Sequence, residues 1–483
     1  MVEMSEYVRF IQRIGLVGIT NILISLSSLI FIPIITKSFT TAEYGMWAQV
    51  NTTIALVPNI ANLGLPYTMV RFLSAEKDKE KIRDSFYPMI SLTFISTVIL
   101  CSLFLIFGNT IADALFNGSM QVLYITTAIS FFACMNLMLI TFFRTFQEMK
   151  RYSLFLVLQS YIGVFVSIYL TYAGYNIETV VLGLLTGYAA VFVMMAFLIV
   201  RYLGFSFGKW SNLREQLAFA IPTIPSNVSS WIVDSSDKYV IGILIGSVAV
   251  GCYSPGYALG SILLMFLSPF AVLLPAILPE HYEKGDIAEV DKYLSYSMKY
   301  YLLLTVPAAV GMSVLSKPLL YIITTPEIAL GGYMVTPFVC LGAIFMGMYG
   351  ITNNILILEK NTMILGKLWI IVAISNIVLN LILVPYLNIL GAAIATLLCY
   401  MLAFSVTAIA SKKTMKLPFN AKETGKIIIA SAIMGLVVYM MNPSGLVNVL
   451  IAIAVGVVVY FAIIFLLKAV TRKELAIFKD LVH

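Results

Sequence analysis

The fold is decided by stretches such as residues 179–200, TVVLGLLTGYAAVFVMMAFLIV, which contain no charged residue. This run lies between Glu178 and Arg201, and its length of about 20 residues is what an α-helix needs to cross the hydrocarbon core of a bilayer. Similar runs cover nearly the whole chain. The sequence therefore predicts an all-α polytopic membrane protein.

Composition supports the membrane class. Mean hydropathy is +0.97 and only 11% of the 483 residues are charged, against about 25% in soluble domains. The net charge of +7 forms no basic stripe outside the apolar runs, so nucleic acid is not an expected partner. The five cysteines lie far apart and His281 and His483 are the two histidines, so we expect no metal site and no cofactor.

About fourteen membrane spans are predicted from the lengths of the apolar runs. They cover residues 14–36, 44–66, 86–107, 120–142, 152–173, 179–201, 217–236, 248–278, 299–322, 332–357, 363–384, 389–410, 425–441 and 446–467.

Lysine and arginine gather in every second connection, for example in loop 67–85 and segment 411–426. On the other side only Lys37, Lys238 and Lys317 remain. The positive-inside rule then predicts a multi-pass protein of the cell (plasma or inner) membrane with both termini in the cytoplasm. Its short outer loops argue against an enzyme that needs an external platform.

Two short stretches resemble each other, TTAEYGMW at residues 40–47 and GSVAVGCY at residues 246–253. Each places a glycine, Gly45 or Gly251, two residues before an aromatic side chain. An even number of spans separates them, so the two halves keep the same orientation and form a parallel repeat. We expect an N-terminal lobe, a second lobe and a terminal pair of helices with a cytoplasmic tail, at residues 1–203, 204–411 and 412–483.

Residues 217–260 carry the resemblance to a known family. They read LAFAIPTIPSN at 217–227, then Trp231, DSSDKY at 234–239 and IGSVAVGCY at 245–253. This pattern resembles the polysaccharide transporters, the Wzx-type O-antigen flippases, of the multidrug/oligosaccharidyl-lipid/polysaccharide (MOP) superfamily. The resemblance implies two six-helix lobes in a V around a central cavity, with two additional C-terminal helices.

The same resemblance implies a function. The chain would flip a polyprenyl-diphosphate-linked oligosaccharide from the cytoplasmic to the outer leaflet by alternating access, without covalent chemistry. Its partners would be that substrate, membrane lipids and a polysaccharide polymerase or glycosyltransferases. An ion-coupled multidrug exporter, which would need a buried carboxylate inside a lobe, is one alternative. A membrane enzyme acting on polyprenyl-linked sugars, which would need clustered acidic or histidine side chains, is the other.

A lipid-linked sugar needs a polar path with cations for its phosphates and amides, hydroxyls or aromatic rings for its sugars. The candidate cations lie near the predicted cytoplasmic ends of spans, where interfacial anchoring is the alternative role: Arg71, Arg144, Lys299 and Lys367. The candidate amides lie within spans, where an interhelical hydrogen bond is the alternative role: Asn51, Asn59, Asn62, Gln159, Asn227, Asn353, Asn376 and Asn380. By spacing, Asn59 should share a helix face with Asn62, and Asn376 with Asn380.

Two further features bear on gating. Asp234, Asp237 and Lys238 form a charged cluster at the predicted outer end of the seventh span, either as a cation or proton site or as an ion pair that fixes the outer gate. The eighth span is too long to cross the membrane straight, and Pro269 could break it and act as a hinge.

Overall fold

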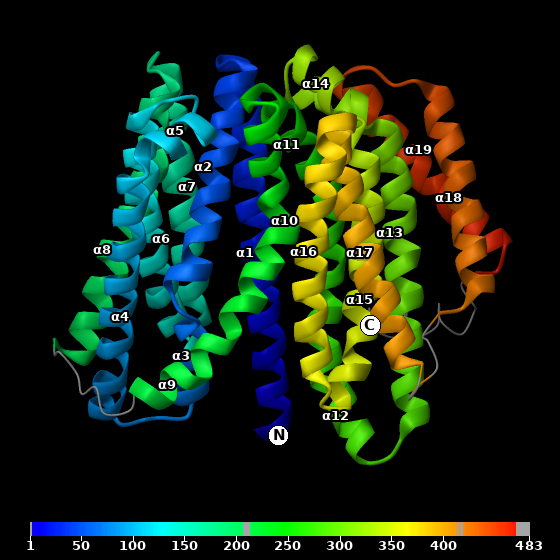
Figure 1. The fold of residues 1–483 in the computed structure, drawn as a ribbon. Helices are drawn as coiled ribbons and strands as arrows, with labels where there is room; N and C mark the ends of the chain where they lie inside the picture. Colours follow the sequence, from blue (N-terminus) through cyan, green and yellow to red (C-terminus); the bar gives the residue numbers. More distant parts are fainter. Residues whose placement is uncertain (1, 206–212, 413–414, 416–418, 470–483) are drawn as a thin grey trace. The chain divides into compact units, whose positions relative to one another are not determined.

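The computed structural model describes residues 2–205, 213–412, 415 and 419–469, which form helices joined by short connections (Figure 1). The remaining parts of the predicted cytoplasmic connections and tail, residues 206–212, 413–414, 416–418 and 470–483, lie outside the described residues. By contacts the chain forms two compact units, one ending at Gly251 and the other beginning at Cys252.

Twelve helices in the described part of the chain are long and apolar enough to cross a membrane. The predicted all-α polytopic class is therefore confirmed. The other two predicted spans correspond to α2 (Thr41–Ala61) and α10 (Ile224–Leu244). Both have 21 residues, but they are too polar to be counted among the twelve.

The first unit contains α1 to α10 and the start of α11. Helix α7 packs against α1 and α8, and α6 packs against α2, α4 and α8. Thr40 and Glu43 form a capping box at the start of α2, and Asn176 caps α8, so these helices begin where their sequences predict. The other helices are α1 (Val2–Ser38), α3 (Leu65–Leu73), α4 (Lys79–Ile106), α5 (Gly108–Leu115), α6 (Met120–Thr145), α7 (Met149–Tyr172), α8 (Ile177–Leu203) and α9 (Leu213–Ala220).

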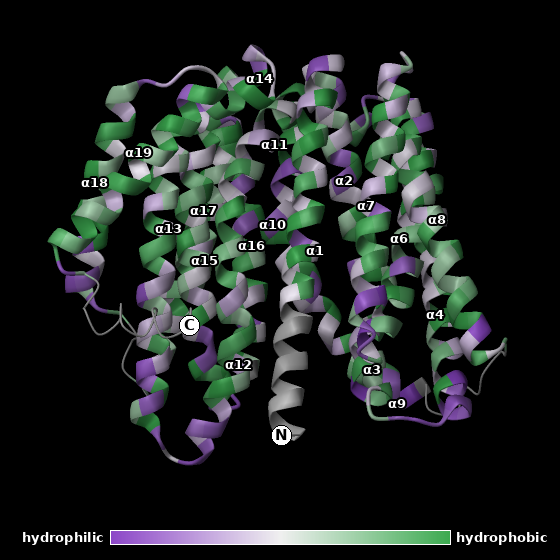
Figure 2. Cartoon of the chain, turned by 180° about the vertical axis from the view of Figure 1, so that it is seen from behind, coloured by the Kyte–Doolittle hydropathy of each residue, from purple (hydrophilic) through white to green (hydrophobic). Residues whose placement is uncertain are grey.

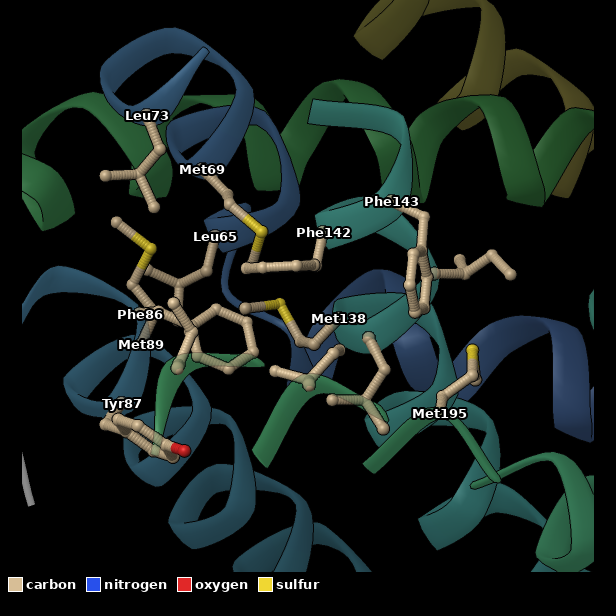
Figure 3. Close-up of a cluster of buried hydrophobic side chains, with 14 of the residues drawn as sticks. Leu65, Met69, Leu73, Phe86, Tyr87, Met89, Met138, Phe142, Phe143 and Met195 are labelled. Carbon is tan, nitrogen blue, oxygen red and sulfur yellow. The ribbon is translucent and has the colours of Figure 1, made fainter. Parts of the chain in front are cut away.

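A cluster of methionine and aromatic side chains forms the main core of the first unit (Figure 3). Met69 from α3, Phe86 and Met89 from α4 and Met138 from α6 are all buried in it. Methionine fills irregular gaps between rings, which suits the junction of a short helix with long ones. The core thus fixes α3, the short helix that follows α2.

A buried polar contact joins α6, α7 and α8. Asn136 donates hydrogen bonds to Oε1 of Gln159 (2.9 Å) and to the carbonyl oxygen of Tyr188 (2.9 Å). Its side chain is only 4% exposed. Beside it, α7 and α8 touch backbone to backbone at Gly187, a close approach that small residues permit.

We expect Asn136→Leu to lower the unfolding free energy in detergent by about 1 kcal/mol, because interhelical hydrogen bonds in membrane proteins have about this strength. The melting temperature measures the effect. Asn448→Leu is the matched control, since Asn448 is exposed and bonds only within its own helix. Equal melting temperatures for both variants would show that the contact contributes no stability.

The second unit is built around α13 (Ile287–Ile323), which packs against α12, α15, α18 and α19. Its core gathers apolar side chains of these helices, among them the buried residues Leu294, Tyr301, Ile351 and Ile427. The other helices are the rest of α11 (Ser247–Ser261), α12 (Ser268–Glu283), α14 (Pro326–Gly332), α15 (Val335–Leu358), α16 (Thr362–Leu387), α17 (Ile389–Ser411), α18 (Ala421–Met441) and α19 (Gly445–Leu466).

Hydrophilic residues concentrate at one end of each unit (Figure 2). In the first unit they surround α3 and α9, and in the second they occupy the turn between α12 and α13. This turn belongs to a connection that the charge pattern assigns to the cytoplasm. The distribution in each unit follows the loop charges read from the sequence.

Several predicted helix boundaries are wrong, among them the end of the second span, which lies at Ala61 rather than 66, and the start of the third, which lies at Lys79 rather than 86. The seventh span runs to Leu244 rather than 236, so Asp237 and Lys238 lie inside α10 and not at its end. The ninth begins at Ile287 rather than at Lys299, because residues 287–298 continue the helix beyond the apolar run. The eighth, expected as 248–278, is divided by a 3₁₀ segment, Ile262–Leu267, directly before Ser268 and Pro269.

A 3₁₀ segment inside a long helix is a common place for bending. Pro269 lies in the first turn of α12, where its missing N–H group costs nothing. The predicted break in the eighth span thus occurs at this proline, while its role as a hinge stays a prediction.

Candidate functional site

Helices α2 and α10, which are too polar to be counted among the twelve apolar spans, pack against each other. Nε2 of Gln49 donates to the carbonyl oxygen of Lys238 (2.7 Å), and the hydroxyl groups of Thr53 and Tyr239 share a hydrogen bond of 2.7 Å. Gln49 and Thr53 are buried. Polar groups that would be costly in lipid are therefore hydrogen-bonded within this pair, apart from Oε1 of Gln49, which is buried without a partner among the described residues.

Glycines bring the start of α2 into backbone contact with the start of α11, the helix that follows α10. A Cβ atom on Gly45 would overlap the carbonyl oxygen of Ser247, and one on Gly251 would overlap the carbonyl oxygen of Thr41. The two contacts are reciprocal, since each glycine meets the residue four positions before the other glycine. Such an exchange is what a two-fold relation between the repeated stretches would produce. We call these contacts the glycine clasp.

The other end of the pair is closed by α3 and α9. Gly64, in a left-handed conformation (φ 73°), approaches the carbonyl oxygen of Ala220 and the hydroxyl group of Thr223. Thr68 on α3 donates to the carbonyl oxygen of Gln216 (3.3 Å). The junction of α2 with α3 is thus held against the junction of α9 with α10.

One face of α10 carries polar groups that remain accessible. Asn227, Ser230 and Asp234 follow at spacings of three and four residues and so share a side of the helix. Asn227 accepts a hydrogen bond from the hydroxyl group of Tyr67 (3.2 Å), and Tyr67 is 49% exposed. We call Tyr67, Asn227, Ser230 and Asp234 the polar strip. It presents hydroxyl, amide and carboxylate groups over about two turns of α10.

The three asparagines of α2 have different surroundings. Asn51 is exposed and Asn59 half-buried, and each donates from its amide nitrogen to a carbonyl oxygen one turn back, of Trp47 and of Ala55. Asn62 is 2% exposed and donates to the carbonyl oxygen of Cys134 in α6 (3.2 Å). Asn62 is the C-cap residue of α2 and keeps a right-handed helical backbone conformation, but its amide is buried against another helix, whereas the amide of Asn59 bonds within α2.

Most of the other candidate amides bond within their own unit. Gln159 accepts from Asn136, as described above. Asn376 and Asn380 are fully buried, and Nδ2 of Asn380 donates to Oδ1 of Asn376 (3.0 Å), so they share a face as predicted. Asn353 is half-buried on α15.

The candidate cations fall into two groups, three that are exposed and one that lies between helices. Arg71 on α3, Arg144 in the last turn of α6 and Lys367 on α16 are exposed. Lys299, whose side chain is only 14% exposed, lies 3.9 Å from Glu423 and so links α13 to α18. The structure therefore places Lys299 at a contact between helices, a role that spacing alone does not reveal.

The two carboxylates of the charged cluster on α10, Asp234 and Asp237, have different surroundings. Asp237 is 0% exposed and accepts from the backbone N–H group of Lys238 (2.8 Å), whereas Asp234 is exposed. Asp237 is a buried carboxylate within the predicted second lobe, the feature that the multidrug-exporter alternative requires. In the described residues, no group of three or more histidine, cysteine, aspartate or glutamate side chains could hold a metal ion.

Some residues of the site were not predicted. Tyr67, Ser230 and Gln49 were not among the candidates, and Gly45 and Gly251 were noted only as signs of a repeat. A usable signal did exist, because span 44–66 contains four amide residues and span 217–236 contains seven serine, threonine or asparagine residues. Two polar spans in one membrane protein are expected to pack against each other, because each needs hydrogen-bond partners within the bilayer.

Solved structures share this fold. The "Lipid II flippase MurJ, inward closed conformation" matches with a TM-score of 0.75 at 20% identity, over 98% of this chain and 100% of that chain. An inward-facing multidrug resistance MATE family transporter of the MOP superfamily matches with a TM-score of 0.66 at 16% identity, over 81% of this chain and 95% of that chain. Fold and span pattern thus define the class, a multi-pass α-helical membrane protein with the MOP superfamily fold.

Sequence comparison gives the family. The model described as polysaccharide biosynthesis protein matches residues 10–279, and the MatE model matches residues 222–382. The "Probable low-salt glycan biosynthesis flippase Agl15" of Haloferax volcanii is 23% identical over 280 residues, which are 57% of this chain and 58% of the relative. The match thus spans little more than half of that relative. The chain belongs to the polysaccharide biosynthesis protein family, as predicted, and shares the fold of a solved transporter of the MOP superfamily.

Proposed function

We propose that this protein is a flippase that moves a polyprenyl-diphosphate-linked oligosaccharide from the cytoplasmic to the outer leaflet by alternating access. The proposal rests chiefly on one observation, the pairing of two polar helices, α2 and α10, within a family of polysaccharide biosynthesis proteins. The name of the Haloferax relative, a glycan biosynthesis flippase, supports it. A transporter needs no covalent chemistry, so we propose that the protein is not an enzyme.

The proposed topology has fourteen crossings, the twelve apolar helices together with α2 and α10. Both termini would lie in the cytoplasm, as the loop charges favour. The lobes would comprise residues 1–203 and 204–411, followed by the last two helices. The reciprocal glycine clasp supports this division, because it pairs the corresponding parts of the two repeats.

In this proposal the polar strip contacts the sugars of the substrate. Its side chains offer hydrogen-bond donors and acceptors that replace water around a glycan. Arg71, exposed on α3 after the strip's Tyr67, would attract the diphosphate at the cytoplasmic side. Exposed Asn51 and half-buried Asn59 extend the polar surface on α2.

The polar strip is tested with Asn227→Leu combined with Ser230→Ala. We expect the rate of glycan translocation to fall at least about tenfold, since a site built to hydrogen-bond a substrate loses affinity when its polar groups are removed. The assay uses purified protein in liposomes with lipid-linked oligosaccharide on one side, and measures how much glycan becomes accessible to an impermeant oxidant. Asn448→Leu, an exposed amide on α19, is the control and should transport normally.

The same assay separates the alternatives. Glycan that becomes accessible with unchanged covalent structure supports a flippase, whereas a new or broken glycosidic bond would identify an enzyme. Ion-dependent export of small cations without glycan movement would identify a multidrug exporter. Normal translocation by the double variant would remove the polar strip from the substrate path.

A further inference from the structure

A second polar and aromatic group lies in the other compact unit, on α15 and α16. Nε1 of Trp369 donates a hydrogen bond to the hydroxyl oxygen of Tyr349 (2.7 Å), and the two rings meet edge to face with centroids 5.6 Å apart. Asn353 follows Tyr349 by one helical turn on α15, and its Oδ1 accepts a hydrogen bond from Nδ2 of Asn354 (3.4 Å). Tyr349 is 4% exposed, while Trp369 and Asn353 are half-buried.

These contacts fix the indole ring from inside the protein. The N–H edge of Trp369 is bound to a buried partner, so its orientation does not depend on the membrane surface. Tryptophans that anchor proteins at the interface usually direct this edge to water or lipid headgroups. Trp369 is therefore held as a rigid ring with part of its surface uncovered.

The space beside this ring is open. Gly366 lies three residues before Trp369 on the same side of α16, and a Cβ atom placed there would meet no atom within 4 Å. Asn353, one turn after the Tyr349 that holds the ring, is half-buried and so contributes a partly accessible amide. A flat aromatic surface with an amide at its edge and free space beside it suits a ligand with an apolar ring face and hydroxyl groups around its rim.

We propose that Trp369 and Asn353 form a binding platform for one pyranose unit of the glycan, with Tyr349 as the positioning residue. The C–H groups of a pyranose ring would pack on the negatively polarised indole face, and its hydroxyl groups would bond the amide. Lys367, two residues from Trp369, projects from a different side of α16, so the platform itself is uncharged and suits a neutral sugar rather than the diphosphate. This inference rests on the proposed function and names a sugar contact for it.

Binding can be tested without transport by labelling the four tryptophans with 5-fluorotryptophan and recording fluorine NMR spectra of the full chain in nanodiscs. The resonance missing in Trp369→Phe belongs to Trp369. We expect this resonance to shift on addition of a methyl glycoside of glucose, galactose, mannose or N-acetylglucosamine, and to stay sharp beside lipids spin-labelled in the acyl chain. No shift with any of these glycosides, or strong broadening by the spin-labelled lipids, would overturn the platform and identify an interfacial anchor.

Tyr349→Phe tests the positioning role, because it removes the hydroxyl group and keeps the ring. We expect the glycoside concentration for half-maximal shift to rise about tenfold, the ratio that one hydrogen bond commonly contributes. In the liposome assay Trp369→Ala should slow translocation, and Trp369→Phe should slow it less. If wild-type protein moves no glycan, the proposed function fails whatever the NMR result, and if Trp369→Ala transports normally only the platform fails.

Discussion

Joining α2 to α10 by a disulfide is expected to stop glycan translocation completely, and reduction is expected to restore it. The pair is Gln49→Cys with Gly242→Cys. A Cβ atom on Gly242 would lie 3.4 Å from Cδ of Gln49, which is two bonds beyond the Cβ atom of Gln49. The two Cβ atoms therefore lie within about 6 Å of each other, and a small movement of the helices would bring them to the separation of about 3.5–4.5 Å that a disulfide requires. Alternating access needs these helices to separate at one stage of the cycle, which a covalent link prevents.

The experiment requires a background in which the five native cysteines are replaced by alanine. Each single cysteine variant, treated with the same oxidant, is the matched control and should keep its activity. Full translocation by the oxidised pair, with the disulfide verified by mass spectrometry, would mean that α2 and α10 stay together throughout transport. The polar pair would then be a fixed structural element rather than a gate.

Replacing Gly251 with valine is the second change with a large expected effect. The new side chain would overlap the backbone carbonyl oxygen of Thr41, which cannot move aside as a side chain does. Forcing extra volume into packed protein costs about 1–3 kcal/mol. We expect translocation to fall at least about tenfold and the melting temperature to fall with it.

The reciprocal geometry sharpens this test. Gly45→Val should have a similar effect through Ser247, and Thr41→Ala should not rescue Gly251→Val because the overlap involves backbone atoms. Gly425→Val on α18 is the control, since a Cβ atom at Gly425 has no neighbour within 4 Å. Rescue by Thr41→Ala, or normal activity of both clasp variants, would contradict the proposed contact.

The sequence predicts the membrane class and the approximate spans because both depend on local composition. The run at 179–200 needs no partner to be recognised as a helix. The predicted boundaries are wrong where a helix continues through polar residues beyond the apolar run. This happens at residues 287–298 of α13 and in α10, which continues to Leu244. Hydropathy measures the solvent that a segment prefers and not the point at which its helix ends.

The partners of individual polar side chains could not be predicted. Asn59 and Asn62 are close in sequence, but α2 ends between them and the backbone then takes left-handed conformations at Leu63 and Gly64. Gln159 and Lys299 are engaged by residues on other helices, Asn136 and Glu423. Tertiary packing decides which amides are accessible, and the spacing of residues in the sequence carries no information about that packing.

The polarity of α2 and α10 has a consequence for biogenesis. Each carries several amide, hydroxyl or charged side chains, and such residues make spontaneous partition from the translocon into lipid unfavourable. The matching groups of α10 are synthesised only after the seven helices α3 to α9 have emerged. We therefore expect nascent α2 to stay in the insertion machinery, or to pack against α6, until α10 has been synthesised.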